Sequence, residues 1–558
     1  MTFHDRRQVL GALGAGLTLP SLALAAGRML DVAYINASIW TGVPGAKGRA
    51  RALGVIGDRI AAVGADEVRA RIGKRTRVVD LKGAFVLPGF TDNHTHFLRA
   101  SQALSAADLR NAGSREELAR QIGASAAKLA PGAWLLGGNW DHERWGGALP
   151  THDWIDAVTP DTPVAVTRQD QHMMLLNTLA LKLAGIDRNT PDPEGGVIVR
   201  DAQGEPTGVL KDKARRLVQR VIPPATDRQV EEALAAGVDY GLSLGVTQVH
   251  VTEVDWITQY GLRRLRARGE THMRFYSFVP LMDWEKMAQI VRTEGRGDDW
   301  VRWGAMKGLV DGSLGSRTAL FHDHYDDAPD TKGIVVTKPA DLKDWVTQAD
   351  RAGLQVTVHA IGDAANDEIL DIYADVERQN GRRDRRFRIE HAQHLAPAAI
   401  SRFKALDVIA SVQPYHAIDD GRWAINRIGA ERLKGTYAFR SLLDSGARVT
   451  FGSDWPVAPL DPRWGLAAAV LRQTIDGASP GGWLPEQKIS IEEALIAYTR
   501  TNAYAGFQDD RLGVIAPGFL ADFVVMDADL LTLDPALITK ASVLRTIVGG
   551  RQRFGESA

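Results

Sequence analysis

The feature that most constrains the fold is a long central stretch in which short apolar runs alternate with amphipathic helical patterns. Eight runs are expected as strands, at residues 85–90, 246–251, 273–279, 303–309, 354–359, 387–391, 408–413 and 448–454. Helical segments such as 228–241, 339–351 and 363–379 lie between them. Eight strands alternating with helices predict an α/β protein built on a (β/α)8 TIM barrel, which we place at residues 88–506.

The spacing is uneven between the first and second strands, where a large insertion is expected at about residues 99–242. Barrels diversify through the loops that follow their strands, so this insertion is a candidate lid or substrate-selecting subdomain. Short strand patterns occupy both ends of the chain, at residues 27–87 and 507–558. They predict one small β-sandwich domain formed from the two ends.

The first 26 residues have the pattern of an export signal. Arg6-Arg7 precedes an apolar, uncharged run that ends near Ala23-Leu24-Ala25. A basic start, an apolar centre and an Ala-x-Ala site are typical of a secretory signal, and paired arginines of the twin-arginine route. We expect a periplasmic or secreted protein that begins near Ala26. The alternative is a membrane tether through an uncleaved N-terminus, which the glycines of the run fit poorly.

Composition narrows the partners and the chemistry. The net charge is -1, so no overall field attracts nucleic acid or an anionic membrane. We expect a small-molecule substrate, no nucleic acid and no stable membrane association after signal removal, and we leave open a homo-oligomer. There is no cysteine, which excludes disulfides and thiolate ligands. A metal ion would therefore need histidine, carboxylate or modified lysine.

Ligand-type residues recur where the predicted strands end. They are His94, His96, Lys307, His359, His391 and Asp454. Residues i and i+2 of an extended chain point to the same side, so His94 and His96 can face one point. A His-x-His pair alone is weak evidence, but the carboxyl ends of barrel strands all meet at one face. The alternative is that each residue is a separately satisfied polar group.

Several motifs carry a family resemblance. They are residues 87–96 (LPGFTDNHTH), Lys307, residues 311–319 (DGSLGSRTA), 358–363 (VHAIGD), 389–391 (IEH) and 452–456 (GSDWP). Together they resemble the metal-dependent amidohydrolase superfamily. Within it they look like the amidohydrolase-3 branch called YtcJ-like, which is related to N-substituted formamide deformylases. The resemblance covers nearly the whole mature chain.

The resemblance implies a metal centre for one or two divalent ions, with zinc expected. His94, His96 and Asp454 would bind one ion, and His359 and His391 a second. Lys307 would bridge them as N6-carboxylysine. The alternative for Lys307 is a salt bridge with Asp311, which would leave a mononuclear site. Asp454 would also move the proton from the attacking water to the leaving amine.

Four further residues are weaker candidates for substrate binding. Trp140 and His172 lie on the insertion, and Asp311 and Arg317 follow Lys307. Packing of the insertion is the alternative for Trp140, and hydrogen bonds that brace the loop are the alternative for Asp311 and Arg317. His416 is interpreted only as a loop residue of the barrel mouth.

The expected reaction is hydrolysis of a C–N bond in an amide or N-substituted formamide-like small molecule through metal-activated water. Two alternatives stay open. The first is an isomerase or decarboxylase that uses the same metal site. The second is a non-catalytic binding protein, which would have no need for a proton-shuttling Asp454.

Overall fold

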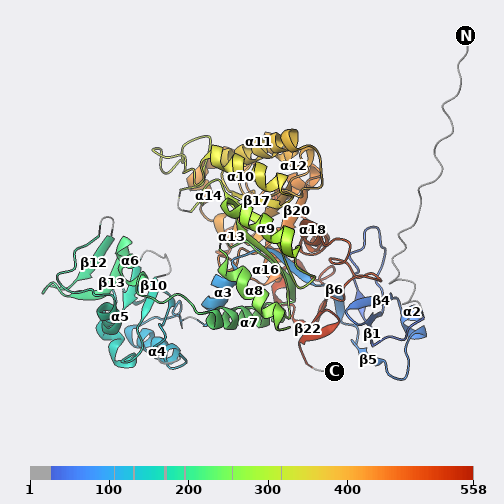
Figure 1. The fold of residues 1–558 in the computed structure, drawn as a ribbon, viewed down its shortest axis with the longest axis horizontal. Helices are drawn as coiled ribbons and strands as arrows, with labels where there is room; N and C mark the ends of the chain where they lie inside the picture. The colour runs from blue at the N-terminus through green and yellow to red at the C-terminus, as the bar shows by residue number, and fades with distance from the viewer. Residues whose placement is uncertain are drawn as a thin grey trace, which may run out of the picture.

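The computed structural model describes residues 27–105, 107–129, 132–168, 173–193, 196–253, 255–315 and 317–556. The expected export signal, residues 1–26, lies outside these ranges. Within them, no helix has both the length and the apolar character needed to cross a membrane. A central barrel stands between the insertion and the β-sandwich, which lie on opposite sides of it (Figure 1).

The barrel contains eight strands in the order β20-β19-β18-β17-β16-β15-β14-β7, and all neighbours are parallel. Their bounds are β7 (Phe90–Thr95), β14 (Val246–Val251), β15 (Arg274–Pro280), β16 (Val301–Leu309), β17 (Gln355–Ala360), β18 (Arg388–His391), β19 (Ile409–Val412) and β20 (Arg448–Phe451). The predicted TIM barrel is confirmed, and seven of these strands overlap the runs expected from the sequence.

The first predicted strand was wrong. Residues 85–90 do not form one barrel strand, because Phe85–Pro88 (β6) pairs with β2 (Ser38–Ile39) and β21 (Phe523–Met526) in the sandwich. The barrel strand β7 begins only at Phe90, after Gly89. Both strands are buried along their whole length, so a single apolar run in the sequence conceals two elements. His94 therefore lies within a strand, not beyond its end.

The barrel closes where β20 meets β7. The backbone N–H of Asp454 donates to the carbonyl of His94 at 2.7 Å, and that of His96 donates to the carbonyl of Trp455 at 2.9 Å. A Cβ on Gly452 would lie 2.7 Å from the backbone nitrogen of His94. Only glycine fits this close approach, and the contact brings the metal-ligand candidates from the two ends of the barrel together.

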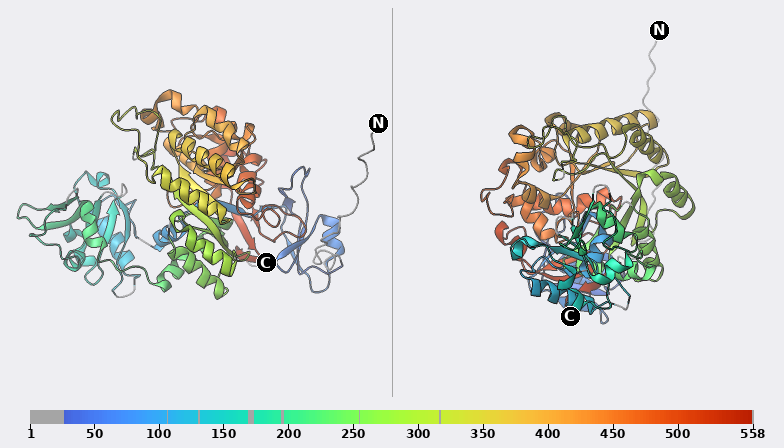
Figure 2. Two further views of the ribbon diagram at one scale, coloured as in Figure 1. Left: turned by 45° about the horizontal axis from the view of Figure 1, so that its top comes forward. Right: turned by 90° about the vertical axis from the view of Figure 1, so that its left-hand side faces the viewer.

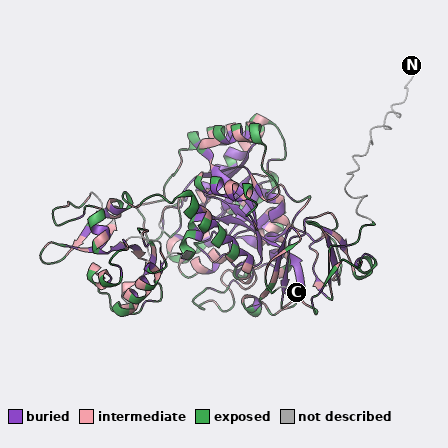
Figure 3. Ribbon diagram, turned by 60° about the horizontal axis from the view of Figure 1, so that its bottom comes forward, coloured by how far each residue is buried: buried purple, intermediate pink, exposed green. Residues whose placement is uncertain are grey.

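Helices surround the barrel and bury their inner faces against it (Figures 2 and 3). The helices of this layer include α3 (Phe97–Ser105), α7 (Asp227–Ser243), α8 (Ile257–Ala267), α9 (Trp284–Glu294), α10 (Pro339–Arg351), α11 (Asp363–Asn380), α12 (Pro397–Ala405) and α16 (Pro462–Leu471). Their starts follow local rules. Thr226 and Gln229 form a capping box before α7, and a proline opens α10.

The insertion is narrower than the 99–242 expected. Helices α3 and α7 pack in the barrel core, and the sheet of the insertion runs from β8 (Ala107–Asp108) to β13 (Pro206–Asp212). Its other strands are β9 (Gly137–Trp140), β10 (Ala165–Arg168), β11 (Met173–Leu176) and β12 (Gly196–Arg200), with α4 (Arg115–Ala126) and α5 (Thr178–Leu183) beside them. Two hydrophobic clusters contain only insertion residues. The insertion therefore has cores of its own.

The sandwich combines both ends of the chain. One sheet contains β4 (Arg59–Val63), β3 (Leu53–Ile56), β1 (Val32–Ile35) and β5 (Arg77–Asp80). The other contains β2, β6, β21, β22 (Val543–Val548) and β23 (Arg551–Phe554). Side chains of the two sheets share one core. Asp522, which precedes β21, forms a buried ion pair with Arg274 of β15 at 2.6 Å, and this pair joins sandwich to barrel.

Candidate metal centre

A cavity of about 450 Å³ opens at the carboxyl ends of the barrel strands. All six predicted ligands line it: His94, His96, Lys307, His359, His391 and Asp454. They come from β7, β16, β17, β18 and the segment after β20, so the barrel brings together residues from 94 to 454. No described residue of the insertion lines this cavity.

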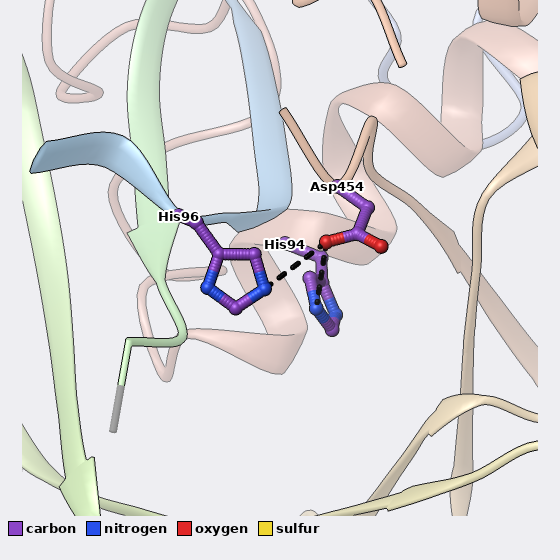
Figure 4. A group of neighbouring side chains, drawn as sticks. All are labelled: His94, His96 and Asp454. Carbon is purple, nitrogen blue, oxygen red and sulfur yellow. Dashed lines mark ion pairs between the residues drawn. The ribbon is translucent and has the colours of Figure 1, made fainter. Parts of the chain in front are cut away.

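Three of these residues form one compact group (Figure 4). An oxygen of Asp454, Oδ1, lies 3.2 Å from Nε2 of His96 and 3.6 Å from Nε2 of His94. His94 and Asp454 are buried, and His96 is partly exposed. Two imidazole nitrogens and one carboxylate oxygen facing each other are donors that suit zinc and similar divalent ions.

A second group shares Asp454 and includes a residue that the sequence did not assign. His391, His416 and Asp454 offer ligand atoms within 4.8 Å of one another. Nε2 of His416 lies 3.8 Å from Oδ2 of Asp454, and the rings of His391 and His416 are nearly parallel. His359 lies beside this group, with its ring centroid 4.5 Å from that of His391. Asp454 thus faces both groups, one with each oxygen.

Two hydrogen bonds define which imidazole nitrogens are available to a metal ion. Nδ1 of His94 lies 2.5 Å from Oε2 of Glu390, and Nε2 of His359 lies 3.0 Å from the carbonyl oxygen of Gly312. Because an ionised carboxylate and a carbonyl only accept, both nitrogens carry the proton. This leaves Nε2 of His94 and Nδ1 of His359 with a free lone pair. Such a partner behind a ligating histidine is common in metal sites.

Burial keeps the histidines neutral. Burial, together with the positive charge of Lys307, lowers the pKa of His94 to about 4 and that of His359 to about 3. Burial alone would raise the pKa of Asp454, but His96 at 3.2 Å and the other neighbouring histidines lower it below its ordinary value. Neutral imidazoles beside an ionised carboxylate are the protonation states that metal binding requires.

Lys307 lies at the base of the cavity, almost completely buried. Burial lowers the pKa of its amine to about 8, although the charges of Glu390 and Asp454 act in the opposite direction. Its Nζ atom has no hydrogen-bond partner among the described residues, and no ion pair joins it to Asp311. A buried amine close to its neutral form is the chemical state from which a carbamate forms.

The buried polar atoms of this site fit a bound cation. Atoms with no hydrogen-bond partner among the described residues include Nε2 of His94, Nζ of Lys307, Nδ1 of His391, Nε2 of His416 and Oδ1 of Asp454. An unpaired buried polar group costs about 1–3 kcal/mol, so five in one cavity would be a large penalty. A metal ion satisfies such atoms directly.

The backbone is strained at two of these residues. His391 has a φ of 73° and Asp454 a φ of 62°, in the left-handed region that side chains other than glycine seldom adopt. Such conformations cost about 1–3 kcal/mol each and cluster at functional sites. Here they turn the two side chains into the cavity at the points where β18 and β20 end.

Three of the four weaker candidates, Trp140, Asp311 and Arg317, do not line the cavity. Trp140 is fully buried in the insertion core, where its indole N–H donates to the carbonyl of Val166. Asp311 accepts backbone N–H groups of Leu320, Ile361 and Gly362, and so it braces the loop after β16. Arg317 pairs with Asp327 on the surface. His172 lies outside the described residues. For Trp140, Asp311 and Arg317 the structure favours the packing and bracing alternatives.

Sequence reasoning missed Glu390 and His416. Glu390 is completely buried, pairs with Arg388 at 2.7 Å and accepts a hydrogen bond from Nδ1–H of His94. In the sequence, the only signal for this role is its position directly before His391. His416 lies on α13 (Pro414–Asp420), directly after β19. No ligand had been expected from that strand, and a histidine two residues beyond a Gln-Pro strand end was the available signal.

Comparisons with known proteins show the family to which this chain belongs. The model of the Amidohydrolase family matches residues 77–554. The chain is 39% identical to Protein LONG AFTER FAR-RED 3 of Arabidopsis thaliana, over 96% of this chain and 94% of that protein. It is 33% identical to Putative amidohydrolase YtcJ of Bacillus subtilis (86% and 91%) and 30% identical to N-substituted formamide deformylase of Arthrobacter pascens (94% and 99%).

A comparison with a solved structure also indicates a metal-dependent hydrolase. An uncharacterized metal-dependent hydrolase from Pyrococcus furiosus superposes with a TM-score of 0.76 at 29% identity, covering 90% of this chain and all of that one. The barrel, the converging ligand atoms and the family match over most of the chain lead to one conclusion. This chain is a metal-dependent hydrolase that belongs to the Amidohydrolase family, in its YtcJ-like branch.

Proposed function

We propose that this protein hydrolyses a C–N bond in an amide or N-substituted formamide-like small molecule. The observation that carries the proposal is the set of buried nitrogen and oxygen atoms around Asp454 that have no hydrogen-bond partner in the part of the chain that the structure describes. The likeness to a protein named N-substituted formamide deformylase supports the choice of bond.

His94, His96, His391, His416 and Asp454 would bind the divalent metal, with zinc as the expected ion and His359 as a further donor through Nδ1. Lys307, as N6-carboxylysine, would supply further anionic oxygen ligands in addition to those of Asp454. A divalent cation in such a site lowers the pKa of a bound water to near neutrality and polarises a substrate carbonyl.

Asp454 is the residue to which we assign proton transfer. Its carboxylate is ionised, buried and within 3.2 Å of His96, so it can accept the proton of an attacking water without changing position. The proton then passes to the leaving amine nitrogen, while the acyl carbon keeps the water oxygen. His416 faces the other carboxylate oxygen, with its Nε2 atom 3.8 Å from Oδ2.

The experiment is a comparison of the purified protein with Asp454→Asn on a panel of N-formyl, N-acyl and primary amides, with elemental analysis of both. We expect divalent metal in both proteins, and a loss of amine release in the variant of about a hundredfold or more. Asp510→Asn, an exposed residue paired with Arg511, serves as the control and is expected to leave turnover unchanged. Full activity of a metal-free protein or of Asp454→Asn would overturn the proposal.

We also expect export by the twin-arginine route to the periplasm or beyond, because of the Arg6-Arg7 pattern. Fractionation of cells that produce the full chain and an Arg6→Lys/Arg7→Lys variant tests this expectation. Export of the variant at the wild-type level would contradict it. We expect neither a nucleic-acid partner nor a stable membrane association for the exported protein.

A further inference from the structure

One wall of the metal cavity carries a carboxylate that the proposed reaction does not use. Asp420 lines the cavity together with Trp423 and Val457 and is only half-buried, so its side chain is accessible from inside. It is the last residue of α13, four positions after His416. Residues i and i+4 of a helix share a face, with Cβ atoms about 5–6 Å apart. Asp420 thus lies one helical turn from the metal centre.

Among the residues that the structure describes, Asp420 has hydrogen-bond partners but no positively charged one. Its Oδ2 atom accepts hydrogen bonds from the hydroxyl of Tyr437 at 2.6 Å and the side-chain amide of Gln393 at 2.9 Å. Both donors are neutral. Oδ1 accepts no hydrogen bond from any residue in the described ranges. Burial raises the pKa of this carboxyl to about 6, as expected for a carboxylate without a cationic partner.

The surrounding charges are also unbalanced. Among the described residues that line the cavity, Lys307 is the one lysine or arginine, and it belongs to the metal centre. Asp419 lies beside Asp420 on the wall and is already paired with Arg422. The guanidinium of Arg427 covers the ring of Trp423 but pairs with Asp327, outside the cavity. The wall beside His416 is therefore acidic, with one carboxylate still open to a cation.

We infer that the substrate is an amide that carries a protonated nitrogen, which Asp420 binds while the scissile carbonyl lies at the metal centre. This inference rests on the proposed function and narrows it to a substrate class. A charge-assisted hydrogen bond to a half-buried carboxylate is among the stronger contacts available to a ligand. A carboxylate at the same position of a substrate would meet Asp419 and Asp420 and would be repelled. Leu314, Trp423 and Val457 supply an apolar surface for the linker between the two polar groups.

The test uses three matched compounds in which a formamide nitrogen bears a chain of four methylene groups ending in ammonium, methyl or carboxylate. A second set has the amide reversed, so that the same chain is attached to the carbonyl carbon. In at least one set we expect kcat/KM to be higher for the ammonium compound than for the methyl compound, by about tenfold or more. The carboxylate compound is expected to be the poorest. Equal rates for ammonium and methyl compounds in both sets would overturn the inference.

Two variants locate the effect. Asp420→Asn keeps the size of the side chain and an oxygen that accepts from Tyr437 or Gln393, and it should reduce the ammonium preference to less than about twofold. Asp419→Asn changes the neighbouring carboxylate of the same wall, which is already paired, and should keep the preference. Circular dichroism and metal content confirm that both variants are folded and loaded. A preference that survives in Asp420→Asn would assign the cation to another group and overturn the role of Asp420.

A binding measurement separates this inference from the hydrolase proposal. Titration calorimetry on the metal-loaded protein compares pentylammonium with pentan-1-ol, which has the same chain and no charge. We expect the ammonium compound to bind about tenfold more tightly than the alcohol to the wild type and no more tightly to Asp420→Asn. If no amide in the panel is cleaved, the hydrolase proposal fails, and this titration still decides whether Asp420 binds a cation. Equal affinities in the wild type would contradict the inference.

Discussion

His416 is a candidate metal ligand that the sequence analysis had interpreted only as a loop residue. Its Nε2 atom is buried, has no hydrogen-bond partner among the described residues and lies 3.8 Å from Asp454. The predicted ligand His359 donates its Nε2–H to the carbonyl of Gly312 and offers Nδ1 instead. The structure therefore adds His416 to the residues that could bind a metal ion.

We expect His416→Asn to weaken binding of the divalent ion by more than about tenfold, because removal of groups that orient or ligate a metal commonly costs 10–100-fold in affinity. A chelator competition assay measures the affinity directly, independently of turnover. His322→Asn, a surface histidine paired with Asp367, is the control and should bind metal like the wild type. Wild-type affinity in His416→Asn would restrict the site to the ligands predicted from the sequence.

Glu390 acts through His94. Its two oxygens accept from His94, Ser411, Thr357 and Arg388, all in the barrel interior. Burial would raise the pKa of Glu390, but Arg388 and His94 hold it well below its ordinary value. This carboxylate is therefore ionised, and it selects the tautomer of His94 that directs Nε2 toward the cavity.

Glu390→Gln should lower metal affinity by about 10–100-fold and should also destabilise the fold by about 3 kcal/mol, because it leaves the buried Arg388 without a counter-charge. Metal titration and urea denaturation monitor the two effects. The surface variant Glu377→Gln, which loses an exposed pair with Arg382, should change neither. A stable Glu390→Gln protein with normal metal affinity would refute the assigned role.

At the scale of single elements, the junction between β6 and β7 determines where the sandwich ends and the barrel begins. Gly89 separates the two strands, and its backbone N–H donates to the carbonyl of Asp522. A Cβ at this position would lie 2.2 Å from Oγ1 and 2.4 Å from Cγ2 of Thr247, whose side chain is buried in β14. Because Thr247 is short and buried, it cannot move aside to make room for a methyl group at residue 89.

Gly89→Ala is expected to destabilise the protein by about 1–3 kcal/mol through overpacking, and to lower its thermal midpoint. Gly113→Ala provides the comparison, since a Cβ there would meet no atom closer than 3.6 Å. Differential scanning calorimetry of the two variants checks the expectation. Equal thermal midpoints for the two variants would show that β7 and β14 can move apart at Gly89 without loss of stability.

The elements that the sequence predicted well are those with one unambiguous signal. Barrel strands such as 246–251 are buried on both faces and are therefore continuous apolar runs, and helices such as 339–351 begin at a proline and have a clear apolar stripe. The run at 85–90 failed because periodicity cannot show a change of sheet between two consecutive buried strands. The insertion bounds failed because α3 and α7 are barrel helices that flank it.

The same limits apply to the site. His94, His96, His359, His391 and Asp454 could be predicted, since motifs at strand ends converge in any barrel. His416 and Asp420 could not, because they lie on a short helix after β19 whose direction depends on tertiary packing. Trp140 was a candidate only while the insertion was expected to cover the mouth.

At the scale of the whole molecule, the barrel and the sandwich are joined by a buried ion pair. Arg274 and Asp522 are almost fully buried, and Asp522 also accepts the backbone N–H of Gly549 at 2.8 Å. The attraction of Asp522 outweighs burial and raises the pKa of Arg274. A buried pair whose members belong to different domains couples their unfolding.

We expect Asp522→Ala to destabilise the full chain by about 3–5 kcal/mol, because Arg274 would be left buried and unpaired. Asp510→Ala, which loses an exposed pair with Arg511, should shift the urea midpoint little. Tryptophan fluorescence and far-ultraviolet circular dichroism follow the two variants. A midpoint for Asp522→Ala equal to that of the wild type would show that the two domains are held together elsewhere.

Synthesis on the ribosome runs from the N-terminus, whereas the sheet β2-β6-β21-β22-β23 needs both ends of the chain. Strand β6 therefore lacks its neighbour β21 until residues 523–526 have been made. Part of the domain that follows the expected leader is thus among the last to reach its final conformation. We propose export by a route that accepts only folded proteins. A truncated chain would lack part of this sheet, close to the expected export signal, and the route could reject it for that reason.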